Sequence, residues 1–306
     1  MLLVVRALML LLPLLGFSLW GSLYKPSPVG GSSASGPGQL PPLPQWSGAP
    51  LPDFSGYQDI TEKKAAFFTY LYPRIVLANS RVLMARGYLL KLAQKENLSP
   101  VELSWLQEQG ERLRVTAPPG SDESFSALRQ RLDAIPPSLV MAQAANESAW
   151  GTSRFAREGN NLFGQWCFSA GCGLVPQRRV DGKNHEVATF DSPYGSVRAY
   201  IQNLNRHRSY QALRNARATA RQSGQWPNGL SMATGLAQYS ERGDAYVKEI
   251  QGMIRFNNLG YFDSQFAELM AKPSAKLLKQ LAAAAEESRL MPGNATAAQS
   301  TPENEG

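Results

Sequence analysis

The sequence predicts a mainly α-helical (α+β) fold, in which a helical domain is interrupted by one short β-prone segment. Apolar residues recur at helical spacing over most of the chain after Asp59, which indicates a series of helices. Residues 160–191 interrupt that spacing with four glycines, both cysteines of the chain and short β-prone stretches. The composition, 43% hydrophobic and 18% charged over 306 residues, is that of a globular protein with one ordinary domain and flanking segments.

Residues 1–25 predict a secretory signal peptide or signal anchor. Arg6 precedes an apolar run from Ala7 to Leu23, and Lys25 follows it. This run of 17 residues is long for a cleaved signal and marginal for a membrane span. Because no clear site for signal cleavage follows it, an uncleaved anchor is favoured over a cleaved peptide. We therefore expect a periplasmic protein tethered to the inner membrane.

Residues 26–55 predict a flexible linker, because a segment rich in Pro, Gly and Ser cannot bury a core. Residues 56–124 predict a helical N-terminal segment. Asp59 is a suitable N-cap for its first helix, which Pro73 is expected to break or kink, and a second helix is expected to continue to about Lys95.

The remaining helices have recognisable starts. Ser99, Pro100 and Glu102 have the spacing of a capping box, and another helix follows Ser121. The main domain is expected over 125–262, with helices at about 137–150, before Gly159, and at about 193–204, 210–221, 230–239 and 244–255. Residues 263–306 are expected to form one more helix after Lys272 and then a disordered end.

The two cysteines, Cys167 and Cys172, are separated by four residues. In an oxidising compartment this pair favours a disulfide, which would close a short loop and contribute about 2 kcal/mol. Free thiols are one alternative. A metal site completed by His185 and His207 is the other, although their spacing matches no zinc pattern. We expect no metal and no cofactor, and both histidines are expected at the surface.

Glu147 ends a stretch that is apolar on nearly every face of its helix. A carboxyl group at the end of a buried helix loses hydration, which favours the protonated form that a general acid uses. Trp150 follows three positions later and offers an aromatic surface for a sugar ring. The residues alone leave a second interpretation open, in which Glu147 is structural and pairs with Arg154 or Arg198.

The segment AANESAWGTSRFAREGNNLFG, residues 144–164, resembles the signature of the bacterial glucosaminidase domain, glycoside hydrolase family 73. The matching positions are Glu147, Ser148, Trp150, Gly151, Ser153, Ala156, Asn160, Asn161, Leu162, Phe163 and Gly164. Residues 190–214 resemble the next segment of the family. More narrowly, the Cys-x4-Cys spacing, the helical segment before the domain and the stretch 234–240 resemble the bacterial Bax subgroup over about residues 60–262.

The resemblance implies a lysozyme-like helical fold with a small β-lobe. It implies hydrolysis of the β-1,4 bond between N-acetylglucosamine and N-acetylmuramic acid in the glycan strands of peptidoglycan, with Glu147 as the catalytic acid. Tyr239 and Tyr246 match two tyrosines of the family's motif. Together with Trp150 and Asn161 they are the expected substrate-binding residues.

Many members of the family carry a second acidic residue early in the β-lobe. The sequence departs from the family here, because the corresponding residues 174–179 contain no carboxylate. The nearest candidates are Asp181, Glu186 and Asp191, of which Glu186 is the possible second acid; its other interpretation is surface charge. The separation of two carboxylates distinguishes inverting from retaining chemistry, so the stereochemical course is not predicted. Substrate assistance by the sugar's acetamido group would need no second carboxylate as nucleophile. Trp166 and Trp226 are expected to be packing residues.

The net charge of +7 favours anionic partners, among them lipid headgroups and cell-wall polymers. Lys and Arg are scattered, without a run that would follow a phosphate backbone, so nucleic acid is not expected. Two rival functions remain. In the first alternative to the enzyme, the chain is a non-catalytic peptidoglycan-binding or scaffold protein. In the second, it is a basic protein that binds anionic polymers through charge alone. No protein partner is predicted.

Overall fold

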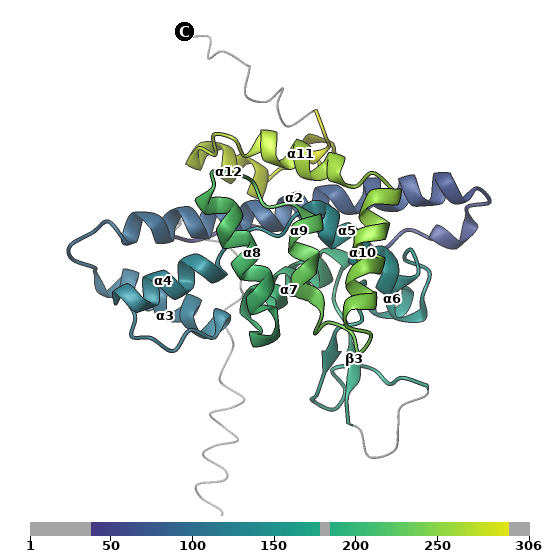
Figure 1. Ribbon diagram of the computed structural model, residues 1–306, viewed down its shortest axis with the longest axis horizontal. Helices are drawn as coiled ribbons and strands as arrows, with labels where there is room; N and C mark the ends of the chain where they lie inside the picture. Colours follow the sequence, from purple (N-terminus) through teal and green to yellow (C-terminus); the bar gives the residue numbers. More distant parts are fainter. Residues whose placement is uncertain (1–37, 178–183, 294–306) are drawn as a thin grey trace, which may run out of the picture. The chain divides into compact units, whose positions relative to one another are not determined.

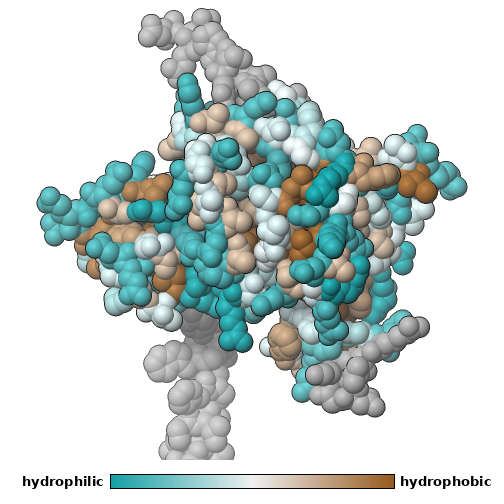
Figure 2. Space-filling view, in the orientation of Figure 1, coloured by the Kyte–Doolittle hydropathy of each residue, from teal (hydrophilic) through white to brown (hydrophobic). Residues whose placement is uncertain are grey.

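The computed structural model describes residues 38–177 and 184–293, and these are mostly helical with one three-stranded antiparallel sheet. This confirms the predicted fold class. The predicted signal or anchor at residues 1–25 lies outside the described residues. None of the described helices is both long and apolar enough to span a bilayer. On the face shown in Figure 2, hydrophobic side chains gather in separate patches among hydrophilic ones.

Helix α2 (Ile60–Leu92) is the longest element, and the other helices of the main core are arranged around it (Figure 1). Asp59 caps its start by accepting a hydrogen bond from the Glu62 N–H. The predicted break at Pro73 is wrong, because one helix continues through this proline. Residues on both sides of Pro73 are buried, and burial of that surface offsets the roughly 3 kcal/mol that a proline costs inside a helix.

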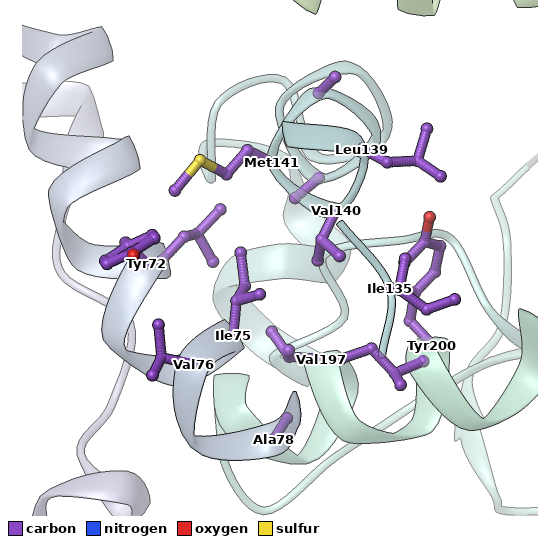
Figure 3. Packing of buried hydrophobic residues seen from close by; sticks show 14 of the residues in the cluster. Tyr72, Ile75, Val76, Ala78, Ile135, Leu139, Val140, Met141, Val197 and Tyr200 are labelled. Atoms are coloured by element: carbon purple, nitrogen blue, oxygen red, sulfur yellow. The ribbon is translucent and has the colours of Figure 1, made fainter. Parts of the chain in front are cut away.

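Helix α5 (Pro137–Ser148) lies at the centre of the main core and contacts α2, α9 (Gly229–Ala233), α10 (Asp244–Phe256) and α11 (Gly260–Leu269). Its apolar residues are buried on nearly every face, as the sequence predicts. Figure 3 shows Leu139, Val140 and Met141 packed among side chains of α2 and of α7 (Pro193–Arg206). Helix α8 (Gln211–Gln222) and the short η3 (Arg208–Tyr210) and η4 (Thr234–Leu236) complete this core.

A second, smaller core lies between the C-terminal half of α2 and helices α3 (Pro100–Leu113) and α4 (Asp122–Arg131). The predicted capping box of α3 is present, with Ser99 and Glu102 exchanging hydrogen bonds. Trp105, Leu106 and Leu128 are among its buried residues.

The sheet forms a small lobe below the helices in Figure 1, after the short helix α6 (Arg154–Gly159). Its strands are β1 (Trp166–Cys167), β2 (Gly173–Leu174) and β3 (Glu186–Ala188), in the order β1-β3-β2. Cys167 and Cys172 form a disulfide, which confirms the favoured expectation and excludes free thiols. Among the described residues, these cysteines and Glu186 are the one group near enough to hold a metal ion, but both sulfurs are already bonded.

The described residues before α2 and those after α11 both pack on α2. Within 38–55, the short helices η1 (Gln45–Gly48) and η2 (Phe54–Gly56) form, and the Phe54 side chain is buried against Phe67. From the C-terminal side, α12 (Ala275–Ala282) lies along α2, and η5 (Glu287–Leu290) follows it. The indole N–H of Trp46 donates to the carbonyl of Ala284 at 2.8 Å. The two flanks are therefore joined to each other as well as to α2.

Candidate active site

Glu147 lies in the last turn of α5, and its side chain is half-buried. The helix ends directly after it, where Ala149, Trp150 and Gly151 all have left-handed backbone conformations with φ of 50°, 61° and 77°. Left-handed conformations in non-glycine residues are costly and persist where the surroundings hold them. Here Ser148 helps, because its hydroxyl donates to Ala144 and accepts from the Gly151 N–H at 2.8 Å.

Glycine is required at position 151 for two reasons. Its φ is positive, and a Cβ there would come within 2.7 Å of the Phe54 ring. The sharp turn after Glu147 thus depends on a close approach between the loop and the packed N-terminal flank. This turn stops α5 so that the Glu147 carboxyl stands at the end of the helix.

A chain of buried hydrogen bonds leads from the core to the Glu147 carboxyl. The Tyr200 hydroxyl donates to Gln143 Oε1. Gln143 Nε2 donates to the Tyr246 hydroxyl at 2.8 Å, and that hydroxyl donates to Glu147 Oε1 at 2.7 Å. Because Gln143 uses its amide as a donor toward Tyr246, the Tyr246 proton is directed at Glu147.

Tyr246 is 2% exposed, and this burial is the main reason why its pKa lies far above the ordinary value of 10.0. The neighbouring Tyr239 and Glu147 raise the pKa of Tyr246 further. A phenol that keeps its proton remains a donor at every physiological pH. Tyr246 therefore holds one oxygen of the Glu147 carboxyl in a fixed place.

Tyr239 connects the same cluster to the loop at residues 160–164. Its ring stacks on that of Tyr246, with centroids 5.5 Å apart and planes 5° apart. Its hydroxyl donates to the Phe163 carbonyl at 2.8 Å. Burial also raises the pKa of Tyr239, so this hydroxyl stays a donor. A Cβ built on Gly164 would lie 3.8 Å from Glu147 Oε2, which places the end of the loop beside the second carboxyl oxygen.

Asn161 determines the shape of this loop. Its side-chain amide donates to the carbonyls of Gln165 and Ala188 at 2.9 and 2.8 Å, and its side-chain oxygen accepts from the N–H groups of Phe163 and Gln165. The Asn161 side chain is buried, and these contacts join the loop to β3. Its contacts in this structure are thus with the protein backbone.

The structure brings three of the five residues expected to act or bind into one cluster, namely Glu147, Tyr239 and Tyr246. Trp150 contacts the N-terminal part of α2 instead, packing on Phe67 and Phe68 with Lys64 Nζ 5.1 Å from its ring centroid. Neither arginine proposed as a structural partner binds Glu147 among the described contacts. Arg154 pairs with Glu158 at 3.5 Å, and no ion pair of Glu147 occurs in the described ranges.

Glu186 lies in β3 and is 8% exposed. Its carboxylate accepts hydrogen bonds from the N–H groups of Gly171 at 3.1 Å and Gly173 at 2.8 Å. These bonds hold the loop that the disulfide closes. These two described contacts of the possible second acid are therefore within the β-lobe.

Sequence reasoning missed Gln143 and Tyr200. Gln143 precedes Glu147 by four positions, so the two side chains lie on the same face of the helix. A single amide within an otherwise apolar helical run was the available signal.

Comparison with known proteins identifies the family of the chain. The glucosaminidase family, described as mannosyl-glycoprotein endo-beta-N-acetylglucosaminidase, matches residues 123–259. Protein bax of Escherichia coli (strain K12) is 34% identical over 208 residues, which is 68% of this chain and 74% of that protein. No solved structure matches the chain. The chain that places Glu147 at this helix end belongs to the bacterial Bax-like proteins of the glucosaminidase-domain family.

Proposed function

We propose that this protein is an endo-β-N-acetylglucosaminidase that cleaves peptidoglycan glycan strands with Glu147 as its general acid. The family supports a glycosidase and a glycan substrate. The observation that carries the finer proposal is the position of the Glu147 carboxyl at the end of a buried helix, where buried Tyr246 holds one of its oxygens.

The geometry supports different roles for the two oxygens of the Glu147 carboxyl. Oε1 accepts the Tyr246 hydrogen bond, while Oε2 is beside Gly164 and carries the proton. That proton passes to the glycosidic oxygen as the bond to the sugar carbon breaks, so the leaving hydroxyl is neutral. Water finally adds to the sugar carbon and gives up one proton, which completes the hydrolysis. Tyr239 and Tyr246 act as positioning residues, because they keep the carboxyl and the 160–164 loop in register. Asn161 has the same role for the loop.

Peptidoglycan is the favoured glycan because two sequence features agree with it. The apolar run at residues 7–23 favours export, and the net charge of +7 favours an anionic polymer. A wall-acting member of this family works in the periplasm or outside the cell. The disulfide is consistent with an oxidising compartment of that kind.

The test is digestion of purified sacculi by the full-length chain in mild detergent, with the products separated and identified by mass spectrometry. New reducing N-acetylglucosamine ends are expected, and Glu147→Gln is expected to lose activity by at least about 100-fold. Glu158→Gln is the matched control, since Glu158 is an exposed glutamate of α6 whose ion pair with Arg154 is solvent-accessible. The anomer of the first product reports the stereochemical course.

Full activity of Glu147→Gln would disprove the assigned acid. Sacculus binding without any bond cleavage by the unmodified chain would favour the rival function of a non-catalytic peptidoglycan-binding protein. Binding that disappears at moderate salt would favour attachment through charge alone, because screening weakens interactions between exposed charges.

A further inference from the structure

Strand β1 and the residue after it carry two strongly exposed aromatic side chains. Trp166 is 60% exposed and Phe168 is 74% exposed. The sequence predicted Trp166 to be a packing residue, and that prediction was wrong. Grouped exposed apolar side chains mark binding surfaces more often than isolated ones do.

The register of the sheet determines which face Trp166 occupies. Trp166 and Leu174 both pair with Val187, and directly paired residues lie on the same face of a sheet. The end of the Leu174 side chain lies 3.4 Å from the place of a Cβ on Gly159, so this face is turned toward the end of α6. Cys167 pairs with Glu186 on the other face. Trp166 therefore projects on the side of the helical domain, and the disulfide on the opposite side.

Hydrogen bonds hold the backbone between Gly164, which lies near the candidate acid, and Trp166. The Gln165 carbonyl accepts from Ala188 N–H at 2.8 Å and from Asn161, and the Gln165 side-chain amide donates to the Ser196 carbonyl at 3.1 Å. Gly164, adjacent to Glu147 Oε2, precedes Trp166 by two residues, which span at most about 7 Å. The Trp166 backbone therefore lies at most about 12 Å from Glu147 Oε2, within about two sugar units of the carboxyl.

A neighbouring ring restricts the orientation of the indole. Its ring stacks on the His185 imidazole, with centroids 4.1 Å apart and planes 20° apart. An aromatic side chain that is already oriented loses little conformational freedom when a ligand stacks on it. A rigid and exposed aromatic ring is suited to the flat apolar face of a pyranose.

We propose that Trp166, together with Phe168 two residues further along the chain, is a carbohydrate-stacking subsite for an N-acetylhexosamine ring of the glycan strand, within about two sugar units of the bond that Glu147 cleaves. The identity of the glycan rests on the proposed function. Trp166 would act in binding, so its removal raises KM and leaves kcat largely unchanged.

The experiment measures binding directly, in the full-length Glu147→Gln chain, by isothermal titration calorimetry with a soluble tetrasaccharide of alternating N-acetylglucosamine and N-acetylmuramic acid. Adding Trp166→Ala is expected to weaken binding about tenfold, which corresponds to about 1.4 kcal/mol. Trp166→Phe keeps an aromatic ring and is expected to bind within about threefold of the parent. Phe256→Ala is the control, because Phe256 is 82% exposed on α10, ten residues from Tyr246 and thus about 15 Å along the helix.

Binding by Trp166→Ala equal to that of the parent would overturn the subsite. An equal loss of binding in Trp166→Phe, or in Phe256→Ala, would overturn the stacking role. Such a loss would mean that the substitutions disturb the protein as a whole and do not act by removing an aromatic ring at position 166. The proposed function is tested in a separate assay, in which digestion of sacculi by Glu147→Gln would disprove that Glu147 is the general acid. The comparison of tetrasaccharide binding tests the role of Trp166 alone. A parent chain that binds no tetrasaccharide would overturn the sugar class.

Discussion

The two sides of Glu147 are built by different means. Behind it, Gln143, Tyr200 and Tyr246 form a chain of hydrogen bonds inside the main core, contributed by α5, α7 and α10. In front of it, the β-lobe has strands of two or three residues, held by local links such as the disulfide and the Glu186 carboxylate.

This difference indicates how stability and function are coupled on each side. A change behind Glu147 opens the core that also holds the acid, so it should lower the unfolding temperature and turnover together. A change in the β-lobe loosens only short-range links, so it should act on substrate binding while the core stays intact.

The largest effect is expected from removing α2, the helix around which the main core is packed. The predicted main domain, residues 125–262 produced alone, lacks the helix against which Val140 and Met141 pack. The exposed surface should cost more than the total stability of an ordinary domain, about 5–15 kcal/mol. We expect no cooperative thermal unfolding by circular dichroism, whereas residues 38–293 should unfold cooperatively. A sharp transition in 125–262 would show that the flanks are dispensable.

The next largest effect concerns Asp133, which is 2% exposed just before α5. Its carboxylate accepts from Arg221 at 2.8 and 3.1 Å, and Arg86 lies 3.7 Å away. Asp133→Asn leaves these guanidinium groups without their buried counter-charge, which should cost about 3–5 kcal/mol. Chemical denaturation at pH 7 measures this loss. Glu158→Gln, at an exposed ion pair, should change stability by less than about 1 kcal/mol.

The Asp133 contribution should depend on pH in a defined direction. Burial alone would raise its pKa, but Arg217, Arg86 and Arg221 together lower the pKa below the ordinary 3.8. A lowered carboxyl pKa gives stability that is complete above the unfolded-state value and is lost as pH falls through the folded-state value. The stability difference between the unmodified chain and Asp133→Asn should therefore be constant near neutrality and shrink below about pH 3.8. A difference that shrinks above pH 5 would contradict this.

A smaller effect on the same side is expected from Tyr246→Phe. Removing the hydroxyl leaves buried Gln143 Nε2 without its acceptor and leaves Glu147 Oε1 with only the long 3.4 Å hydrogen bond from the Asn146 amide among the described contacts. Stability should fall by about 1–3 kcal/mol, and kcat by up to about 100-fold, with KM little changed. The control is Tyr70→Phe, because the Tyr70 hydroxyl makes a long 3.3 Å hydrogen bond to the Pro50 carbonyl and contacts Arg74 rather than Glu147 or Gln143. A fall in kcat without loss of stability would mean that the two properties are not coupled behind Glu147.

These residues also show how far the sequence could predict the structure. The α3 capping box was predictable because its signal is local, between Ser99 and Glu102. The break at Pro73 was wrong because burial along α2, a tertiary effect, outweighs a local proline signal. The Gln143 contacts were missed because its partners Tyr200 and Tyr246 lie 57 and 103 positions away.

The motif, by contrast, supplied what local physics could not. Periodicity predicts a buried helix that ends near Glu147, but it does not bring Tyr239 and Tyr246 to that helix. The family resemblance named all three residues, and the structure places them in one cluster. The exposure of Trp166 depends on the pairing of β1 with β3. Strands of two or three residues are too short for their pairing to be predicted from the sequence.

The most local effect is expected from opening the disulfide on the lobe side with Cys167→Ser and Cys172→Ser together. The crosslink closes a short loop, so its loss should cost about 2 kcal/mol, and Glu186 would still bind the Gly171 and Gly173 N–H groups. Because the link is local, hydrogen exchange should quicken at Gly171 and Gly173 while the amides of α5 keep their protection. KM should rise and kcat should change little. If the α5 amides also exchanged faster, the lobe and the core would form one cooperative unit, and the contrast between the two sides of Glu147 would be wrong.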